Sequence, residues 1–189
     1  SNGYVYVTAD NVVYVINPST NKVIGTIQAG VRLWGIVYDP SNGYLYVADA
    51  GSSTVLVIDP STNRIIANIT VGQYTVVYYW AGSIVYDPSN GYIYVADSGS
   101  NTVSVIDPRN NTVIANITVG TYPADIVYDP SNGYIYVTNW QSNTISVIDP
   151  SNNTVIATIP VGAFPTDIAY DPSNGYLYVV NSGFNSISV

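Results

Sequence analysis

The chain of 189 residues contains no cysteine, histidine or methionine, and because its 12 acidic residues are all aspartate it has no glutamate either. Without cysteine there can be no disulfide framework, and without cysteine and histidine the usual zinc sites are excluded. Acid–base catalysis would fall to aspartate or tyrosine, and no serine or threonine nucleophile has an evident base. We therefore predict that the protein is not an enzyme and needs no cofactor.

Charged residues are also scarce, at 8% of the chain against about a quarter in ordinary soluble proteins. Only four residues are basic and the net charge is -8, which excludes the basic surface that a nucleic-acid partner requires. Hydrophobic residues reach 47%, yet no apolar run approaches a membrane span, so we expect no membrane insertion in this segment. A chain with few charges and no oxidisable side chains suits an extracellular setting, and it loses little when an acidic medium protonates aspartate.

What the sequence has in abundance is a repeat of about 42 residues, a period typical of solenoids and propellers. Its marker is the hexapeptide Asp-Pro-Ser-Asn-Gly-Tyr, which begins at Asp39, Asp87, Asp129 and Asp171, and the last four residues of the hexapeptide open the chain at Ser1. The repeat makes residues 1–189 a single region of successive units, which cover residues 1–40, 41–88, 89–130, 131–172 and, in part, 173–189.

Each unit reads as four short strands separated by turns. In the unit that follows the hexapeptide at Asp129, the expected strands cover residues 134–138, 145–148, 155–159 and 167–170. β-Branched and aromatic residues dominate them, and no helical periodicity extends over a useful length. Four antiparallel strands in each unit are typical of a β-propeller blade, so we predict an all-β fold.

The turns have a chemical basis. Proline fixes φ at the second turn position, and the aspartate before it can accept hydrogen bonds from backbone N–H groups two or three residues further on. The Asn-Gly pair that follows tolerates positive φ. Most of the acidity is explained in this way, because seven of the 12 aspartates precede a proline. They are Asp39, Asp59, Asp87, Asp107, Asp129, Asp149 and Asp171.

A second repeated motif points to a family. The tetrapeptide Tyr136-Val137-Thr138-Asn139 has counterparts at the same place in the other units, which begin at Tyr46, Tyr94 and Tyr178. With the Asp-Pro-Ser-Asn-Gly turns and the Val-Gly-x-x-Pro segments at Val119 and Val161, these motifs make the whole chain resemble the YVTN-type β-propeller repeats of archaeal surface-layer and other extracellular proteins. The resemblance implies a propeller, commonly of seven blades, with roles in cell envelopes or adhesion, and it implies no catalytic residue.

By analogy with that family, the strand before each Asp-Pro-Ser-Asn-Gly turn is the innermost, and we name the strands a to d from the axis to the rim. The prediction is then 18 strands in five blades. The first blade has b, c and d, the next three have all four, and the last has a, b and c. We expect such a chain to be part of a larger propeller or assembly, and strand addition between subunits at open edges is one hypothesis for filament growth.

Four N-glycosylation sequons occur, with the acceptors Asn68, Asn110, Asn116 and Asn152. The first and third acceptors lie in strand d, and the other two lie in the turn between strands c and d. All four are therefore expected at the outer edge of the propeller, where a glycan has room. The alternative is that asparagine and threonine are simply abundant in this chain.

The unit that begins at Ser41 is longer than its neighbours, and the extra residues fall in an aromatic stretch between strands d and a. Exposed aromatic loops are often contact sites. The predicted partner contacts share one face with the b–c loops, and they are Tyr74, Tyr78, Tyr79, Trp80, Trp140 and Phe184. The alternative is a loop that folds over the central channel and packs against its own protein.

Oxygen ligands that suit Ca²⁺ fall on the same face. They are Asp49, Asp97, Asn139 and Asn181 at the end of strand b, and Asp125 and Asp167 near the beginning of strand a. However, there is no compact Asp-x-Asp loop, and the repeat exchanges aspartate for asparagine freely. We therefore favour structural hydrogen bonding over a Ca²⁺ site.

These observations favour a non-enzymatic extracellular structural protein of an archaeal surface layer, filament or adhesive coat, which acts by self-assembly of rigid propeller blades at the cell surface. Its partners would be other copies of itself or other surface proteins. The alternative is a module that binds a glycan or a protein through its aromatic loop face. A propeller enzyme such as a lactonase is a third hypothesis, although a shared fold does not carry a function.

Overall fold

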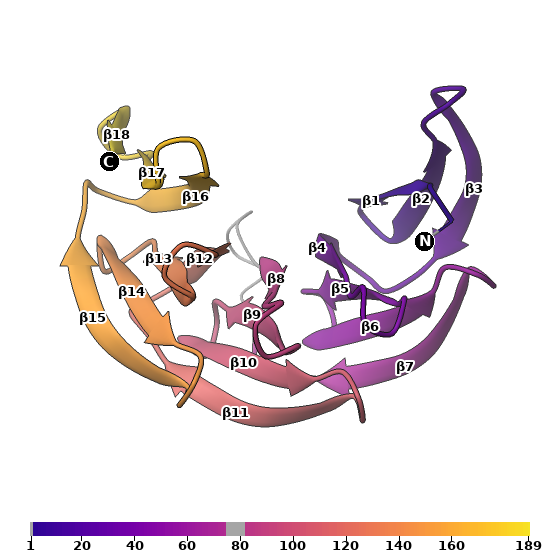
Figure 1. The fold of residues 1–189 in the computed structure, drawn as a ribbon, viewed down its shortest axis with the longest axis horizontal. Coiled ribbons are helices and arrows are strands. Elements are labelled where there is room, and N and C mark those ends of the chain that lie inside the picture. The colour runs from indigo at the N-terminus through magenta and orange to yellow at the C-terminus, as the bar shows by residue number, and fades with distance from the viewer. Residues whose placement is uncertain (1, 75–81) are drawn as a thin grey trace.

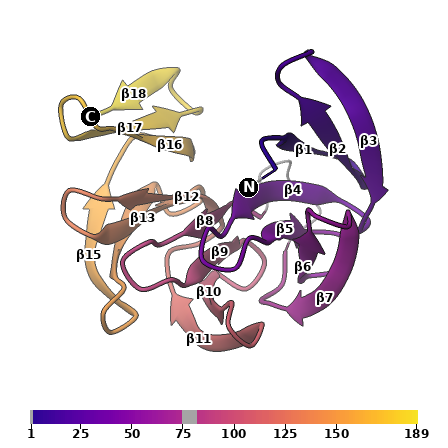
Figure 2. The same cartoon turned by 45° about the vertical axis from the view of Figure 1, so that its right-hand side comes forward.

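The computed structural model describes residues 2–74 and 82–189. Every regular element in these residues is a β-strand. No helix that is long and apolar enough to cross a membrane occurs in this described part of the chain. The strands form five antiparallel sheets that follow one another along an arc, as the blades of a propeller do (Figure 1). Figure 2 shows the first and last blades at the two ends of this arc.

The first blade contains β1 (Val5–Ala9), β2 (Val12–Asn17) and β3 (Lys22–Gln28). The second contains β4 (Leu33–Tyr38), β5 (Leu45–Asp49), β6 (Thr54–Asp59) and β7 (Arg64–Thr70). The third contains β8 (Ile84–Tyr86), β9 (Ile93–Asp97), β10 (Thr102–Asp107) and β11 (Thr112–Thr118). The fourth contains β12 (Pro123–Asp129), β13 (Tyr134–Asn139), β14 (Thr144–Asp149) and β15 (Thr154–Pro160). The fifth contains β16 (Pro165–Asp171), β17 (Tyr176–Asn181) and β18 (Ser186–Ser188).

The predicted architecture is confirmed, because the described residues form 18 strands in five blades, of which the first and last have three strands. The a strands β4, β8, β12 and β16 lie on the inside of the arc, and the d strands β3, β7, β11 and β15 lie on the outside (Figure 1). Each sequence unit begins at its strand b, so it supplies strands b, c and d of one blade and strand a of the next. This offset joins neighbouring blades through the chain itself.

The core lies between the blades. Four clusters of buried side chains each fill the space between two consecutive blades. In β5 the alternation of a strand sends Leu45 and Val47 toward the first blade and Tyr46 and Ala48 toward the third. Both faces of the middle strands are therefore buried, and a blade has no complete core without its neighbours.

The turns adopt the predicted chemistry. In the first complete marker, Oδ1 of Asp39 accepts hydrogen bonds from the backbone N–H of Ser41 (2.8 Å) and from its hydroxyl (2.7 Å). Oδ1 of Asn42 accepts from the N–H of Tyr44 at 2.8 Å. Gly43 has φ of 80° and donates its N–H to the carbonyl of Asp39 at 2.9 Å. The aspartates of these markers are thus turn residues, as expected.

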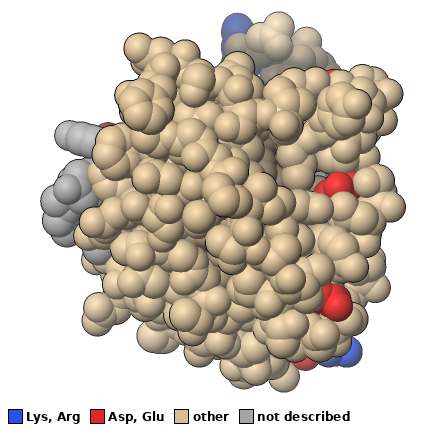
Figure 3. All heavy atoms as spheres, turned by 90° about the vertical axis from the view of Figure 1, so that its left-hand side faces the viewer, with Lys and Arg blue, Asp and Glu red and all other residues tan. Residues whose placement is uncertain are grey.

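Few charges reach the surface. Figure 3 looks onto the side where the fourth and fifth blades lie, and nearly all atoms there belong to uncharged residues, with the acidic groups toward one margin. Among the described residues the one ion pair joins Arg109 to Asp107, with an N–O distance of 2.7 Å. Ion pairs therefore contribute little to this fold, which rests on apolar packing and hydrogen bonds.

Candidate functional site

The connections of the blades gather on two opposite faces. We call the face with the a–b and c–d turns the turn face, and the face with the b–c loops and the segments before strand a the loop face. On the loop face, backbone hydrogen bonds join each b–c loop to the segment before strand a of the same blade. Trp140 donates to the carbonyl of Tyr122 at 2.8 Å, and Ser182 donates to the carbonyl of Phe164 at 3.0 Å.

Three aromatic rings meet on the loop face where the fourth and fifth blades adjoin. Trp140 and Phe164 are stacked, with ring centroids 4.8 Å apart and an interplanar angle of 26°. Tyr122 meets Trp140 edge to face at 6.1 Å and 79°. Phe164 is 41% exposed, whereas the other two side chains are half-buried. This aromatic cluster is a partly exposed apolar surface of the kind that binds partners.

The cluster depends on an unusual backbone. Tyr122 and Phe164 both have φ of 54°, in the left-handed region that bulky residues seldom adopt, and both precede a proline, which favours an extended backbone. Their N–H groups donate to Oδ1 of Asn101 (2.9 Å) and Asn143 (2.8 Å), which belong to the b–c loop of the preceding blade. Contacts between blades therefore hold the two aromatic residues in a strained conformation, and such strain is often found at functional sites.

The glycine of each Val-Gly-x-x-Pro segment has a packing role. A Cβ atom on Gly120 would lie 2.6 Å from Cγ of Asn139, and a Cβ atom on Gly162 would lie 2.6 Å from Cγ of Asn181. No larger residue fits at either place. The segment can therefore cross closely over the end of strand b and present the aromatic residue that follows.

The predicted contact residues have different positions. Trp140 lies at the centre of the aromatic cluster, and Phe184 lies after β17 with 74% of its surface exposed. Tyr74 corrects the prediction, because it is buried in the core between the second and third blades with 7% exposure and is a packing residue. Tyr78, Tyr79 and Trp80, which we predicted as contacts in the same stretch, lie outside the described residues.

Sequence reasoning missed two members of the cluster. Tyr122 and Phe164 lie in the two Val-Gly-x-x-Pro segments, which we interpreted only as family motifs. A signal was available, because both are aromatic residues directly before the proline of a Val-Gly-x-x-Pro segment. Their meeting with Trp140 was not predictable, since it depends on the left-handed backbone and on the packing of one blade against the next.

The side chains that end strand b make structural hydrogen bonds, which is the role that we predicted for them. The carboxylate of Asp49 accepts from the backbone N–H groups of Val31 (3.1 Å), Arg32 (2.9 Å) and Gly51 (3.1 Å), and from the Ser52 hydroxyl (2.6 Å). Burial opposes ionisation, but these hydrogen bonds from Ser52 and the backbone outweigh it and lower the pKa of Asp49. Residues 2–74 and 82–189 contain no group of three or more acidic side chains placed to hold a metal ion.

Asp97 occupies the same position in the third blade but has a different environment. Its side chain is fully buried, and burial raises its pKa to about 7, although hydrogen bonds from Ser104 and Thr102 act against this rise. Oδ2 accepts from the Ser104 hydroxyl at 2.6 Å, while Oδ1 has no hydrogen-bond partner. Asn139, the equivalent residue of the fourth blade, donates a hydrogen bond from Nδ2 to the hydroxyl of Ser146 at 2.9 Å and carries no charge.

Asp125 joins three blades near the axis. Its Oδ1 accepts from the hydroxyl of Ser83 in the third blade at 2.6 Å, and its Oδ2 accepts from the N–H of Ile168 in the fifth blade at 2.9 Å. Burial raises the pKa of Asp125. Asp167, the equivalent residue of the fifth blade, is exposed and accepts no hydrogen bond from the described residues. The carboxylate of Asp125 is therefore a structural link.

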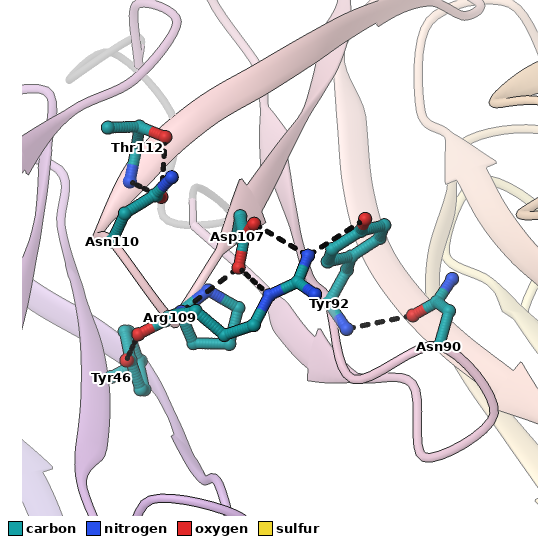
Figure 4. Close-up of polar contacts among 8 residues, drawn as sticks. Tyr46, Asn90, Tyr92, Asp107, Arg109, Asn110 and Thr112 are labelled. Atoms are coloured by element: carbon teal, nitrogen blue, oxygen red, sulfur yellow. Dashed lines mark hydrogen bonds and ion pairs between the residues drawn. The ribbon is translucent and has the colours of Figure 1, made fainter.

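The turn face shows how consecutive blades are joined at the other end. The hydroxyl of Tyr46 lies 3.1 Å from Oδ1 of Asn111 and 3.4 Å from the carbonyl oxygen of Pro108, in the c–d turn of the next blade. Figure 4 shows Tyr46 beside this turn. We call this contact the inter-blade fastening. In the first blade the hydroxyl of Tyr6 donates to the carbonyl of Pro60 at 3.3 Å. In the third blade the hydroxyl of Tyr94 donates to Oδ1 of Asn153 at 3.2 Å.

The same view shows the turn of the third blade in detail. Arg109 donates two hydrogen bonds to Asp107, at 2.8 and 2.7 Å, and one to the hydroxyl of Tyr92 at 3.2 Å (Figure 4). The hydrogen bonds from Arg109 lower the pKa of Asp107. The arginine side chain is 73% exposed, so this ion pair adds little to stability and serves to order the turn.

The four sequon asparagines are all exposed. In the c–d turns, Oδ1 of Asn110 and Oδ1 of Asn152 each accept from the hydroxyl of the sequon threonine at 2.6 Å. In strand d, Oδ1 of Asn116 accepts from the hydroxyl of Ser104 at 3.0 Å. Asn68 lies in β7 at the position equivalent to Asn116. Glycosylation at these residues stays a prediction.

Comparison with known proteins gives a consistent fold. Residues 29–155 match the family model described as Lactonase, 7-bladed beta-propeller. Hydrazine synthase from Kuenenia stuttgartiensis has a TM-score of 0.83 and 23% identity, over 94% of this chain and 52% of that one. A functionally unknown protein from Desulfotomaculum acetoxidans has a TM-score of 0.75 and 18% identity, over 98% of this chain and 64% of that one. The chain thus spans less than two thirds of either structure, and the likeness concerns the fold alone. No curated protein matches the sequence.

Proposed function

The chain belongs to the Lactonase, 7-bladed beta-propeller family, and on this premise we propose that it is a non-enzymatic extracellular structural protein. We assign it to an archaeal surface layer, filament or adhesive coat, which it builds by self-assembly of rigid blades. Its scarcity of charge and its lack of cysteine and methionine support a place outside the cell. The lack of histidine, cysteine and glutamate supports a role without catalysis.

The inter-blade fastening is the observation that carries this proposal. The same tyrosine contact joins the first blade to the second, the second to the third and the third to the fourth. With a buried core layer between each pair of blades, it supports a stiff body that transmits force from blade to blade. A stiff body of this kind suits the mechanical role of a coat or filament.

The test is the assembly state of the purified chain without added ligand. Sedimentation velocity between about 1 and 100 μM should reveal concentration-dependent association, and electron microscopy should show ordered filaments or sheets. A chain that stays monomeric over this range contradicts the proposal. Turnover of compounds from a lactone and ester panel would contradict the non-enzymatic part of it, and the family name makes that panel the right one.

A second candidate function is supported by the aromatic cluster. A module that binds a glycan or a protein would use Trp140 and Phe164, which are held by strained backbone on one face. Binding of a polysaccharide that is lost in Trp140→Ala and kept in Tyr176→Ala, an exposed tyrosine of β17, would favour this function. Equal binding by both variants would place the contact elsewhere.

A further inference from the structure

The outermost strand of each of the first four blades carries a β-bulge at the same position. The register between strands c and d shifts after Val15, Val57, Val105 and Val147. The shift leaves one residue of each d strand without an opposite partner. These residues, which we call the rim isoleucines, are Ile24, Ile66, Ile114 and Ile156.

The bulge turns each rim isoleucine outward. Their exposures are 50%, 46%, 44% and 48%, so the repeated sequence of the d strands gives nearly the same exposure in each blade. A bulge bends its strand and re-aims a side chain, and it also blunts the edge against pairing with another strand. The rim is therefore suited to contacts between side chains rather than to a continuous sheet that runs from one molecule into the next.

One further aliphatic residue of the d strands, Ile65, is 38% exposed, whereas Ile27, Ile69 and Ile117 of the same strands are buried in the core. A single exposed apolar side chain needs no explanation, but a set that recurs in strand after strand along one surface indicates a contact. The outer surface of the blades is thus the part of the described chain where large aliphatic side chains are most regularly exposed.

The charges indicate what this surface contacts. Two copies that each carry a net charge of -8 repel one another wherever their aspartates face. None of the four d strands contains an aspartate, and two begin with a cation, Lys22 and Arg64. Neither cation has an ion-pair partner in the described residues. Both lie next to the turn face, where they can pair with the acidic turns of a neighbouring molecule.

We propose that the rim formed by β3, β7, β11 and β15 is the surface through which copies of this chain associate side by side, with the rim isoleucines at the centre of the contact. The inference rests on the proposed self-assembling function and names the surface that this function uses. It requires that Asn68 and Asn116, which lie in the same strands as Ile66 and Ile114, carry no glycan. Because the isoleucine recurs from blade to blade, one molecule can make the same contact in several directions, as a sheet or coat requires.

The test compares two variants with the parent chain by sedimentation velocity. The double variant Ile114→Thr and Ile156→Thr keeps β-branched side chains and adds no charge, while it removes apolar surface from the rim. Val31→Thr is the control, because it also replaces a β-branched aliphatic side chain by threonine, at a valine of the loop face that is 68% exposed. We expect the double variant to raise the apparent Kd of association at least tenfold and the control to leave it within twofold.

Each outcome is informative. Equal association of the parent and the double variant would overturn the rim inference and leave self-assembly standing through another surface. A monomeric parent would overturn self-assembly itself, and the rim inference with it. An independent measurement uses the parent alone, since hydrogen exchange at β11 and β15 should slow as the chain is concentrated. Slowing confined to the loop face would contradict the inference even if the variants failed to fold.

Discussion

The residue at the end of strand b has a different ionisation behaviour in different blades. Asp49 is ionised because three backbone N–H groups and a hydroxyl compensate its burial. Burial raises the pKa of Asp97 to about 7, since its hydrogen bonds do not outweigh the burial and one carboxylate oxygen has no partner. Asn139 fills the same place with a neutral amide. The exchange of aspartate for asparagine in the sequence thus has consequences for the pH dependence of stability.

The substitution Asp97→Asn should stabilise the protein above neutral pH. The ordinary pKa of 3.8 applies when the chain is unfolded, whereas the folded value is about 7. Stability from this group is therefore fully present below about pH 4 and is lost as the pH rises to about 7. With about 1.4 kcal/mol for each pKa unit, the variant should gain on the order of 2–4 kcal/mol at pH 8 and little at pH 4. Urea unfolding at both pH values measures this.

Asp49→Asn is the control for that experiment. The pKa of Asp49 is lowered in the folded protein, so its contribution is present at neutral pH and is lost as the pH falls through the folded value. The same chemical change in the second blade should therefore destabilise the protein at pH 8. If both variants shift the free energy of unfolding in the same direction at pH 8, the opposite pKa shifts of Asp49 and Asp97 are contradicted.

At the scale of elements, the blades are joined at three levels. Apolar layers fill the spaces between them, the fastening tyrosines connect strand b to the next c–d turn, and Asp125 connects three a strands at the axis. Each level links residues that are far apart in the sequence, with a separation of 65 between Tyr46 and Asn111. Cooperative unfolding of the described blades follows from this arrangement.

Removal of one fastening should loosen one interface. In Tyr46→Phe the hydroxyl that bonds to Asn42 and Asn111 is lost from a fully buried position, and the partners are left unpaired. We expect the free energy of unfolding to fall by about 1–2 kcal/mol. Tyr178→Phe is the matched control, because among the described residues the Tyr178 hydroxyl bonds to Asn174 alone, and its loss should cost less. Thermal unfolding measures both, and equal losses would contradict the inter-blade role.

The axial link should be equally sensitive. Asp125→Ala removes the acceptor of Ser83 and of the Ile168 N–H, so we expect a loss of about 1–3 kcal/mol, with faster hydrogen exchange in β16. Asp167→Ala makes the same change at the exposed equivalent residue and should be close to neutral. A loss of similar size in both variants would mean that charge rather than the link between blades matters.

At the scale of the whole molecule, surface charge controls association. The acidic groups are concentrated in the Asp-Pro turns and the net charge is -8, so copies that approach one another are repelled at low salt. We expect association to strengthen severalfold between about 20 and 200 mM salt, over which the Debye length falls below about 10 Å. Light scattering at pH 7.5 measures it. Weaker association at higher salt would contradict this expectation and show that the ion pairs of Lys22 and Arg64 outweigh the apolar contact of the rim.

The sequence by itself determined the blades. Strand spacing and the Asp-Pro-Ser-Asn-Gly turns depend on residues that are close together in the chain, where backbone propensity and turn chemistry act locally. These features predicted the strands, whereas the order from a to d and the division among blades came from the resemblance to the YVTN-type repeats. The glycine and proline of the turns were therefore reliable signals, because each sets the backbone conformation at its own position.

Only the tertiary structure decided which side chains meet or stay exposed. Tyr74 was predicted as a partner contact, with packing against its own protein as the alternative, and it is buried in the core layer between two blades. The aromatic cluster and the different pKa values of Asp49 and Asp97 depend on neighbours from other units. The rim isoleucines sit in ordinary strand sequence, and a bulge turns them outward. Burial, strain and register are properties of packed blades, so no single repeat contains the information that sets them.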